Sequence, residues 1–477
     1  MGATALFALL WAVARACVQS ITIDEADTYL VWVARPNPSH WEASSNNHVL
    51  NSLLMRLSTS IFGLSHLSVR APALLGAAIY ILMALTLCRL LSPVVRVQWP
   101  LFAGLVFNPF IFDHLVAARG YALALGFLMA ALAIAAYSHA RAWPLWQACA
   151  ACSVCLALSF AANFSFAIVD AFTLAAIAIW ACARTQALQT RARIAGACIL
   201  PGLLATLFVS APVVLNWPKG QLIYGSHSLR EWFGEVVRDS LYELNPQIVN
   251  PMLMQALDHV KGWLIPILLA LAAWQWGSIL RRKTAQHLPD FCYLVLAVST
   301  ASIVTHWTMF KLFHVLMPKE RTAIWIVPLA MLAIGAVATG RRALTISLYT
   351  LSFYFLLCLR LNYFREWYWD ADVNKVYAVL AQYNHSSGVK EVASNWMYSS
   401  ALNYYRLASG RETLDEIPGF IEMPPGRSIY VLNYVHDEAF LKQQKLRVVY
   451  HGPASEVVVA VRTDAEDQWR VPGCGVN

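Results

Sequence analysis

Apolar residues dominate this chain in long runs, and most polar positions fall between those runs. A helix that crosses a bilayer needs about 20 predominantly apolar residues. The first such run resembles a signal peptide, but its first six residues carry no positive charge, which favours an uncleaved span. The pattern predicts eleven membrane-spanning helices, at residues 2–19, 67–91, 97–112, 116–137, 143–161, 163–183, 194–215, 259–280, 288–306, 322–339 and 343–361.

The pattern changes after the last run. Residues 366–477 alternate helical stretches with β-rich segments at 428–435, 446–452 and 455–462. The predicted fold is therefore mainly α: a polytopic transmembrane helix bundle of about eleven spans in residues 1–365, followed by a small α/β domain in residues 366–477.

Composition and charge support this division. The chain is 58% hydrophobic and 13% charged, whereas roughly a quarter of the residues in a soluble protein are charged. This composition excludes an ordinary soluble enzyme. Residues 1–365 carry 25 Lys and Arg against 13 Asp and Glu, whereas residues 366–477 carry 10 against 14. The basic region is expected in the membrane and the acidic region in water.

The basic residues of the short loops predict the orientation. Loops with an excess of Lys and Arg stay in the cytoplasm. The outer side then holds the loops 20–66, 216–258 and 307–321 and the C-terminal domain. We expect a multi-pass protein of the cell (inner) membrane that works on its outer, periplasmic face. Five alternate loops are basic and contain no acid: they carry Arg89 and Arg96; Arg141; Arg184, Arg191 and Arg193; Arg281, Arg282 and Lys283; and Arg341 and Arg342.

Three carboxylates, Asp24, Glu25 and Asp27, follow the first span within four residues. Crowded carboxylates repel one another, so at least one has a raised pKa unless a cation or hydrogen-bond donor compensates. Such a group is suited to act as a general base. A solvated helix start, stabilised by the helix dipole, is an equally good interpretation.

Two further outer segments gather ionisable side chains. Asp113, His114 and Arg119 lie between two predicted spans with almost no connecting loop, and ionisable groups at the edge of hydrocarbon indicate a functional site. The alternative is a pair between Asp113 and Arg119 that only joins two helices. Lys319 and Arg321 precede the tenth span and suit an anionic headgroup, or else an interfacial anchor.

The sequence lacks the motifs of other enzyme classes. It has no Gly-x-x-x-x-Gly-Lys-Ser/Thr loop, no Gly-x-Gly-x-x-Gly after a predicted strand and no His-Glu-x-x-His motif. Neither a nucleotide nor a nucleic acid is therefore an expected partner.

Taken together, these segments resemble the GT-C superfamily of membrane glycosyltransferases, close to the protein mannosyltransferase and aminoarabinose transferase group of glycosyltransferase family 39. The resemblance runs from about residue 20 to residue 325. It rests on the Asp24-Glu25 pair after the first span, the helix beginning at His48, and the segments LSVRAPALLGA, NPFIFDHLVAARGYALAL and PKERTAIW.

The resemblance implies an inverting hexosyl- or pentosyltransferase. Its donor would be a polyprenyl-phosphate sugar, and its acceptor a lipid, a glycan or a protein. Members of the family differ in their use of a divalent cation such as Mg²⁺ or Mn²⁺. The implied roles are catalysis for Asp24, as general base, with Glu25 and Asp113; substrate binding for Asp27, His48, His114 and Arg119; donor-phosphate binding for Lys319 and Arg321; and candidate metal ligation for Asp24, Asp113 and His114.

Two other classes of function stay open. A polysaccharide ligase or polymerase would place its essential Arg and His in long outer loops. A membrane transporter of lipid-linked or small substrates would show internal repeats, broken helices and charges at the middle of the bilayer. Asp170, inside the sixth predicted span, is the one residue that approaches this last pattern.

Overall fold

In the computed structural model the chain divides into two compact units. The first contains the described residues of Met1–Val13, Ser39–Leu54 and Ala71–Leu359, and the second those of Ala14–Pro38, Met55–Arg70 and Arg360–Asn477. The residues described are 1–35, 41, 44, 46–140, 143–214, 224–245, 247–282, 289–410 and 414–462.

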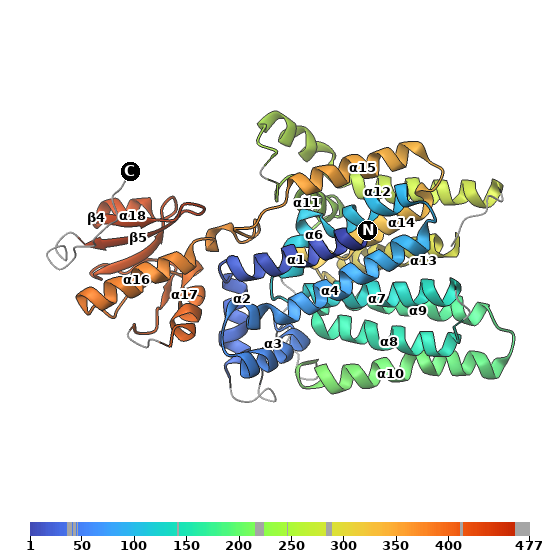
Figure 1. Ribbon diagram of the computed structural model, residues 1–477, viewed down its shortest axis with the longest axis horizontal. Coiled ribbons are helices and arrows are strands. Elements are labelled where there is room, and N and C mark those ends of the chain that lie inside the picture. The colour runs from blue at the N-terminus through green and yellow to red at the C-terminus, as the bar shows by residue number, and fades with distance from the viewer. Residues whose placement is uncertain are drawn as a thin grey trace. The chain divides into compact units, whose positions relative to one another are not determined.

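The first unit is a bundle of apolar helices (Figure 1). Each of the eleven predicted spans corresponds to a helix or to a bent pair of helices. The helices are α1 (Gly2–Val18), α3 (Val49–Phe62), α4 (His66–Leu91), α5 (Val95–Val106), α6 (Pro109–Val116), α7 (Tyr121–Ala140), α8 (Leu145–Ala162), α9 (Ala167–Ala183), α10 (Leu188–Val214), α11 (Leu229–Leu241), α12 (Pro251–Arg282), α13 (Pro289–Phe313), α14 (Ile326–Ala338) and α15 (Arg342–Leu357). Of these, α1, α3 and α4 contribute residues to both units.

Length and composition identify a multi-pass membrane protein. Within the described residues, eight helices are long and apolar enough to cross a bilayer, and the number rises to ten if each of two bent pairs counts as one span. The 16-residue helix α15 is apolar but shorter than these. The predicted fold class is confirmed, and the count of eleven spans stays a prediction.

Several boundaries differ from the sequence prediction: α10 begins at Leu188, α12 begins at Pro251 and α13 ends at Phe313. The run 97–112 contains a break, because α5 ends at Val106 and α6 begins at Pro109 with a bend of 58° between them. Asn108 causes the new start: its side-chain oxygen accepts the backbone N–H groups of Phe110 and Ile111, at 3.0 and 3.3 Å. Proline at the first helical position fits this start, since that N–H has no helical partner. The bend thus lies before Asp113, which is inside α6.

The second unit contains a five-stranded mixed sheet of order β2-β1-β3-β5-β4. The strands β1 (Ala393–Asn395), β2 (Gly419–Phe420) and β3 (Ile429–Asn433) are parallel, and β4 (Leu446–His451) and β5 (Val457–Arg462) run antiparallel to their neighbours. The three predicted β-rich segments are β3, β4 and β5. The sequence pattern missed β1 and β2 because they have three and two residues.

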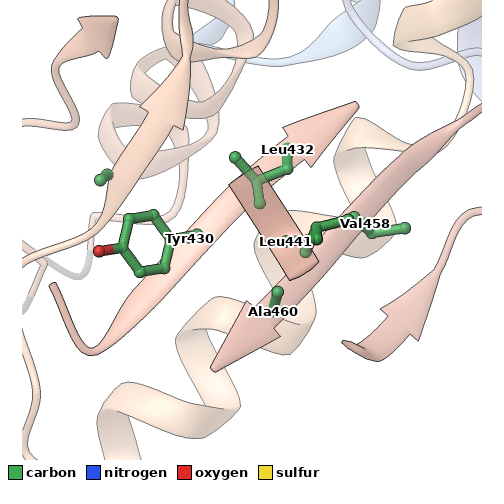
Figure 2. Packing of buried hydrophobic residues seen from close by; sticks show 6 residues of the cluster. Tyr430, Leu432, Leu441, Val458 and Ala460 are labelled. Atoms are coloured by element: carbon green, nitrogen blue, oxygen red, sulfur yellow. The ribbon is translucent and has the colours of Figure 1, made fainter. Parts of the chain in front are cut away.

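Alternate residues of the two central strands form one face of the sheet's core. Tyr430 and Leu432 of β3 pack with Val458 and Ala460 of β5 and with Leu441 of α18 (Glu438–Gln443) (Figure 2). Side chains two positions apart on a strand share a face, which explains the pairing. The α/β character predicted for the tail is confirmed.

The remaining elements of the second unit come from both ends of the chain. From the N-terminal region come α2 (Ile23–Asp27) and the following π-helical turn Thr28–Val33, and from the tail come the 3-10 turn Tyr368–Asp370 and the helices α16 (Val373–Ser387) and α17 (Trp396–Ala408). The second unit therefore includes the acidic segment as well as the sheet. The predicted division into a membrane region at residues 1–365 and a soluble domain at residues 366–477 stays a prediction.

Candidate active site

The acidic segment of the second unit begins with a reciprocal cap. The Thr22 hydroxyl accepts the backbone N–H of Glu25 at 3.2 Å, and the Glu25 carboxylate accepts the backbone N–H of Thr22 at 3.0 Å. This capping box satisfies two backbone donors that the first turn of α2 would otherwise leave unpaired. It fixes where the helix starts and hence where Asp24 stands.

Glu25 is fully buried and paired with Arg70 of α4. The guanidinium donates to both carboxylate oxygens, at 2.8 and 2.7 Å, and neither side chain is exposed. It also donates to the carbonyl oxygens of Ala16, Gln19 and Ser20, at 3.0, 2.8 and 2.6 Å. Glu25 is thus not part of a solvated helix start. Arg70 was not predicted as a site residue, although an arginine inside an apolar run is itself a signal of a buried partner.

Asp24 is half-buried and meets the turn that follows the last span. The indole N–H of Trp367 donates to one Asp24 carboxylate oxygen at 3.1 Å. Asp370, 1% exposed, accepts the backbone N–H of Ile23 at 2.8 Å. Asp27 is also half-buried. The three acids of the motif therefore have different surroundings, and Asp24 and Asp27 are the more accessible two.

Asp370 adds a fourth carboxyl group to this segment. Burial raises its pKa well above the usual range; the hydrogen bond from Ile23 acts in the opposite direction, and the charges of Asp24, Glu25 and Asp27 raise it further. Its second oxygen is buried and accepts no hydrogen bond from the described residues. The sequence prediction missed Asp370, which directly follows the aromatic end of the last predicted span.

The first unit contains a pocket of about 530 Å³. Two predicted site residues, His48 and Arg321, line it. The other polar residues of its lining come mainly from helix starts and connections, and the apolar ones from α9, α13 and the segment that follows α13. They are Asn46, Tyr121, Asn163, Phe164, Ser165, Ala167, Ile168, Tyr224, His306, Met309, Val315, Leu316, Met317, Pro318, Glu320 and Thr322.

The start of α3 docks on the start of α7 and forms one wall of this pocket. Asn51 donates to the carbonyl oxygen of Ala118 at 2.9 Å, and the buried guanidinium of Arg119 donates to the Asn46 side chain. Gly120, whose φ is +77°, lets the end of α8 and the residue before α3 approach the start of α7, because a Cβ there would lie 2.2 Å from the Ala162 carbonyl oxygen and 3.0 Å from the His48 Cβ. Arg119 thus supports this wall of the pocket by holding Asn46, which lines it.

Aromatic contacts connect His114 with the same wall. The Tyr121 ring lies between two histidine rings, with its centroid 5.0 Å from that of His114 and 5.6 Å from that of His48. His114 is fully buried, and its Nδ1 lies 2.9 Å from the Phe110 carbonyl oxygen one turn earlier in α6. Asp113, also fully buried, precedes it in the same helix.

Asn163 lines the pocket between the end of α8 and the start of α9. Its side-chain oxygen accepts the backbone N–H and the hydroxyl of Ser165, at 3.0 and 2.7 Å. Its amide nitrogen is buried and has no hydrogen-bond partner among the described residues. A buried donor without a partner is costly, so a ligand acceptor beside Asn163 would be favourable.

The turn after Pro318 contributes Glu320, Arg321 and Thr322 to the lining of the pocket. Ser226 and Met317 exchange two backbone hydrogen bonds, at 2.7 and 3.1 Å, which join the segment before α11 to the segment before this turn. The Lys319 ammonium lies 3.4 Å from the Glu231 carboxylate of α11, and Arg238 of α11 lies 3.5 Å from Glu320. Arg321 lines the pocket, whereas Lys319 reaches α11.

The structure thus groups some of the predicted site residues. His48, His114, Arg119 and Arg321 belong to the pocket or its wall, whereas Asp24, Glu25 and Asp27 belong to the second unit. Of the predicted outer loop 216–258, residues 216–223 and 246 lie outside the described residues. Across the described stretches of the chain, no group of three or more His, Cys, Asp or Glu side chains is placed to hold a metal ion.

Several solved structures resemble this chain. Two of them are ArnT from Cupriavidus metallidurans in the apo state, at 13% identity, and the same protein bound to undecaprenyl phosphate, at 11%. Each match covers 96% of this chain and 96% of the other, with a TM-score of 0.45. No family model and no curated protein matches the sequence.

Proposed function

We propose that this protein is an integral membrane glycosyltransferase. It moves a sugar from a polyprenyl-phosphate donor to a lipid, glycan or protein acceptor on the outer face of the membrane. The observation that carries the proposal is the pocket of the first unit, where the cation of Arg321 shares a lining with the apolar Met309 and Leu316. A polyprenyl phosphate has the same division between an anionic head and an apolar tail, and a guanidinium suits phosphate.

The side of the membrane follows from the basic loops. The Arg and Lys residues expected in the cytoplasm fall in the sequence at the helix ends and connections α4–α5, α7–α8, α9–α10, α12–α13 and α14–α15. The pocket is lined from the α8–α9 connection and the segment after α13, which belong to the other set of helix ends. Nucleotide sugars are confined to the cytoplasm, so a donor used on the outer side is expected to be carried by a lipid.

The general base in this proposal is Asp24 of the acidic segment. Asp24 takes the proton of the acceptor hydroxyl or amine as that group attacks the anomeric carbon. The bond between the anomeric carbon and the phosphate oxygen breaks, the configuration inverts, and the polyprenyl phosphate leaves with the electron pair. Arg321 stabilises the charge that develops on it. The half-buried state of Asp24 supports its role, and the closed pairing of Glu25 with Arg70 supports a structural role for Glu25.

Native mass spectrometry with a total membrane lipid extract, which supplies both polyprenyl-phosphate sugars and candidate lipid acceptors, tests this function. Wild-type protein is expected to bind a polyprenyl-phosphate sugar and to consume it, Asp24→Asn to bind and retain it, and Arg321→Gln to lose most of the bound donor. Glu438→Gln, on the surface of the C-terminal sheet domain, is the matched control for removing one carboxylate. Consumption of the donor by Asp24→Asn at the wild-type rate would contradict the assignment of the base.

A transporter is the second candidate, because two helix pairs are bent. The pair α1 and Ile23–Val33 is bent by 77° and the pair α5 and α6 by 58°, and broken helices are a feature of transporters. Asp170 in α9 is buried and accepts a hydrogen bond from Ser159 at 3.1 Å. A transporter would bind an extract component and release it chemically unchanged, so the mass of the recovered lipid distinguishes the two functions.

A further inference from the structure

The turn that follows the last span holds the start of α2 at three points within the second unit. Trp367 donates its indole N–H to the Asp24 carboxylate at 3.1 Å. Asp370 accepts the backbone N–H of Ile23 at 2.8 Å. The Ser20 hydroxyl donates to the carbonyl oxygen of Ala371 at 2.9 Å. Two segments that are 343 to 351 residues apart in sequence are therefore joined around one carboxylate.

The Trp367 indole is buried and packed against a neighbouring ring. Trp367 is 1% exposed, and its ring meets the Phe364 ring edge to face, with centroids 5.8 Å apart. The guanidinium of Arg70 lies over the same Phe364 ring, 5.1 Å from its centroid, while also pairing with Glu25. The N–H that reaches Asp24 thus belongs to a packed side chain, so the hydrogen bond restricts the orientation of the carboxylate.

The far end of the turn is anchored in the sheet domain. The Asp372 carboxylate, 1% exposed, accepts the backbone N–H groups of Ala454 and Ser455 at 2.7 and 2.9 Å and the Ser455 hydroxyl at 3.0 Å. These two residues belong to the connection between β4 and β5. Residues 367–372 therefore form a strap that runs from Asp24 to the sheet.

We propose that Trp367 is a positioning residue that aims the Asp24 carboxylate, and that Asp370 fixes the backbone just before it. This inference rests on the proposed function, in which Asp24 is the general base. A base must be held in a narrow range of geometries to accept a proton in the transition state, and a misplacement of about 1 Å can reduce the rate about a hundredfold. The strap provides that restriction from the opposite end of the chain.

The test replaces Trp367 in two ways. Trp367→Phe keeps most of the ring volume and removes the N–H, whereas Trp367→His keeps a ring N–H and loses volume. A positioning role predicts that Trp367→Phe retains the polyprenyl-phosphate sugar of the total lipid extract at wild-type occupancy but consumes it about ten- to a hundredfold more slowly. It also predicts that Trp367→His is the faster of the two variants, although it is the less stable one.

A purely structural role predicts the reverse order, with Trp367→Phe faster than Trp367→His, because packing volume alone would then matter. That order, or wild-type turnover by Trp367→Phe, would overturn the inference. Trp369→Phe removes an indole N–H from the same turn and serves as the control, with turnover expected at the wild-type level. Comparable losses in Trp369→Phe and Trp367→Phe would likewise overturn it, since any change in the turn would then suffice.

Asp370 is tested by two further variants. Asp370→Asn keeps an oxygen that accepts the Ile23 N–H and is expected to turn over at close to the wild-type rate, whereas Asp370→Leu removes the acceptor and is expected to be slower. Equal rates for the two variants would overturn the role given to Asp370.

Asp24→Asn, measured in parallel, separates the inference from the function on which it rests. If Asp24→Asn is inactive and Trp367→Phe is fully active, only the positioning role fails. If Asp24→Asn is as active as the wild type, the assignment of the base fails, whatever Trp367 does.

Discussion

Replacing Arg70 by alanine is expected to destabilise the second unit more than any other single change to a charged residue described above. The substitution removes the bidentate pair with Glu25 and the hydrogen bonds to three carbonyl oxygens at the end of α1. Both members of the pair are fully buried, so water cannot replace the lost partner. Breaking a buried ion pair by removing one partner costs about 3–5 kcal/mol.

This cost is large beside the total stability of a domain, about 5–15 kcal/mol. For a unit of this size, a loss of about 3–5 kcal/mol lowers the Tm by roughly 6–20 °C. The assay is thermal unfolding in detergent followed by tryptophan fluorescence, since Trp32 and Trp367 of the second unit are buried and reach solvent when that unit unfolds. Arg56→Ala is the matched control. That guanidinium donates to the Arg35 carbonyl oxygen in an exposed setting, so its removal is expected to change stability by about 1 kcal/mol or less.

A double variant sharpens the test. With Arg70→Met, the substitution Glu25→Gln removes the charge that the first change leaves uncompensated, and much of the lost stability is expected to return. The reasoning is refuted if Arg70→Ala unfolds at the temperature of Arg56→Ala. It is also refuted if Glu25→Gln fails to recover any stability in the Arg70→Met background.

Three further predictions concern other positions. The raised pKa of Asp370 means that the folded state holds its proton more tightly than the unfolded state, so this contribution to stability is full at low pH and is lost as the pH rises through the folded pKa. The Tm of the wild type minus that of Asp370→Asn should therefore fall as the pH rises above 3.8, the ordinary pKa of an Asp carboxyl. A difference that stays constant with pH would argue against a raised pKa. Gly120→Ala places a Cβ against the Ala162 carbonyl oxygen at a residue with positive φ, and should lower the free energy of unfolding by about 1–3 kcal/mol. It should also weaken donor retention in native mass spectrometry. Retention at the wild-type level would contradict the role of Gly120 in the wall of the pocket. Asp372→Ala leaves the buried N–H and hydroxyl of Ser455 without their acceptor, which should destabilise the C-terminal sheet domain by about 1–3 kcal/mol. Proteolysis of that domain should become correspondingly faster. An unchanged rate of proteolysis would show that the hydrogen bonds of Asp372 are dispensable.

The apolar runs predicted the helices well because a span of about 20 apolar residues needs no tertiary information to be recognised. The break before Pro109 was missed because proline at a helix start and proline inside an apolar run look alike in sequence. Trp367 and Asp370 were missed for another reason. Their importance comes from contact with a segment 343 to 347 residues away, which no local pattern records.

Glu25 also shows that a local sequence pattern does not reveal a distant partner. Its place in the acidic segment allowed two interpretations, a general base or a solvated acid, and both assumed that the group was accessible. The partner that decides its state, Arg70, lies 45 residues further along the chain. Opposite charges inside apolar sequence are best treated as candidate contacts, since each alone would be too costly to bury.

The strap from Trp367 to Asp372 also has a consequence for biosynthesis. Asp24 and Ile23 leave the ribosome early, but the side chains that hold them are separated from them by 343 and 347 residues. At about 5–20 residues per second, these partners follow roughly 17–70 s later. The pairing of Glu25 with Arg70 requires only 45 further residues and can form during that interval. The acidic segment is therefore assembled in two stages, and a chain truncated before Trp367 would keep its early ion pair while leaving Asp24 without its indole partner.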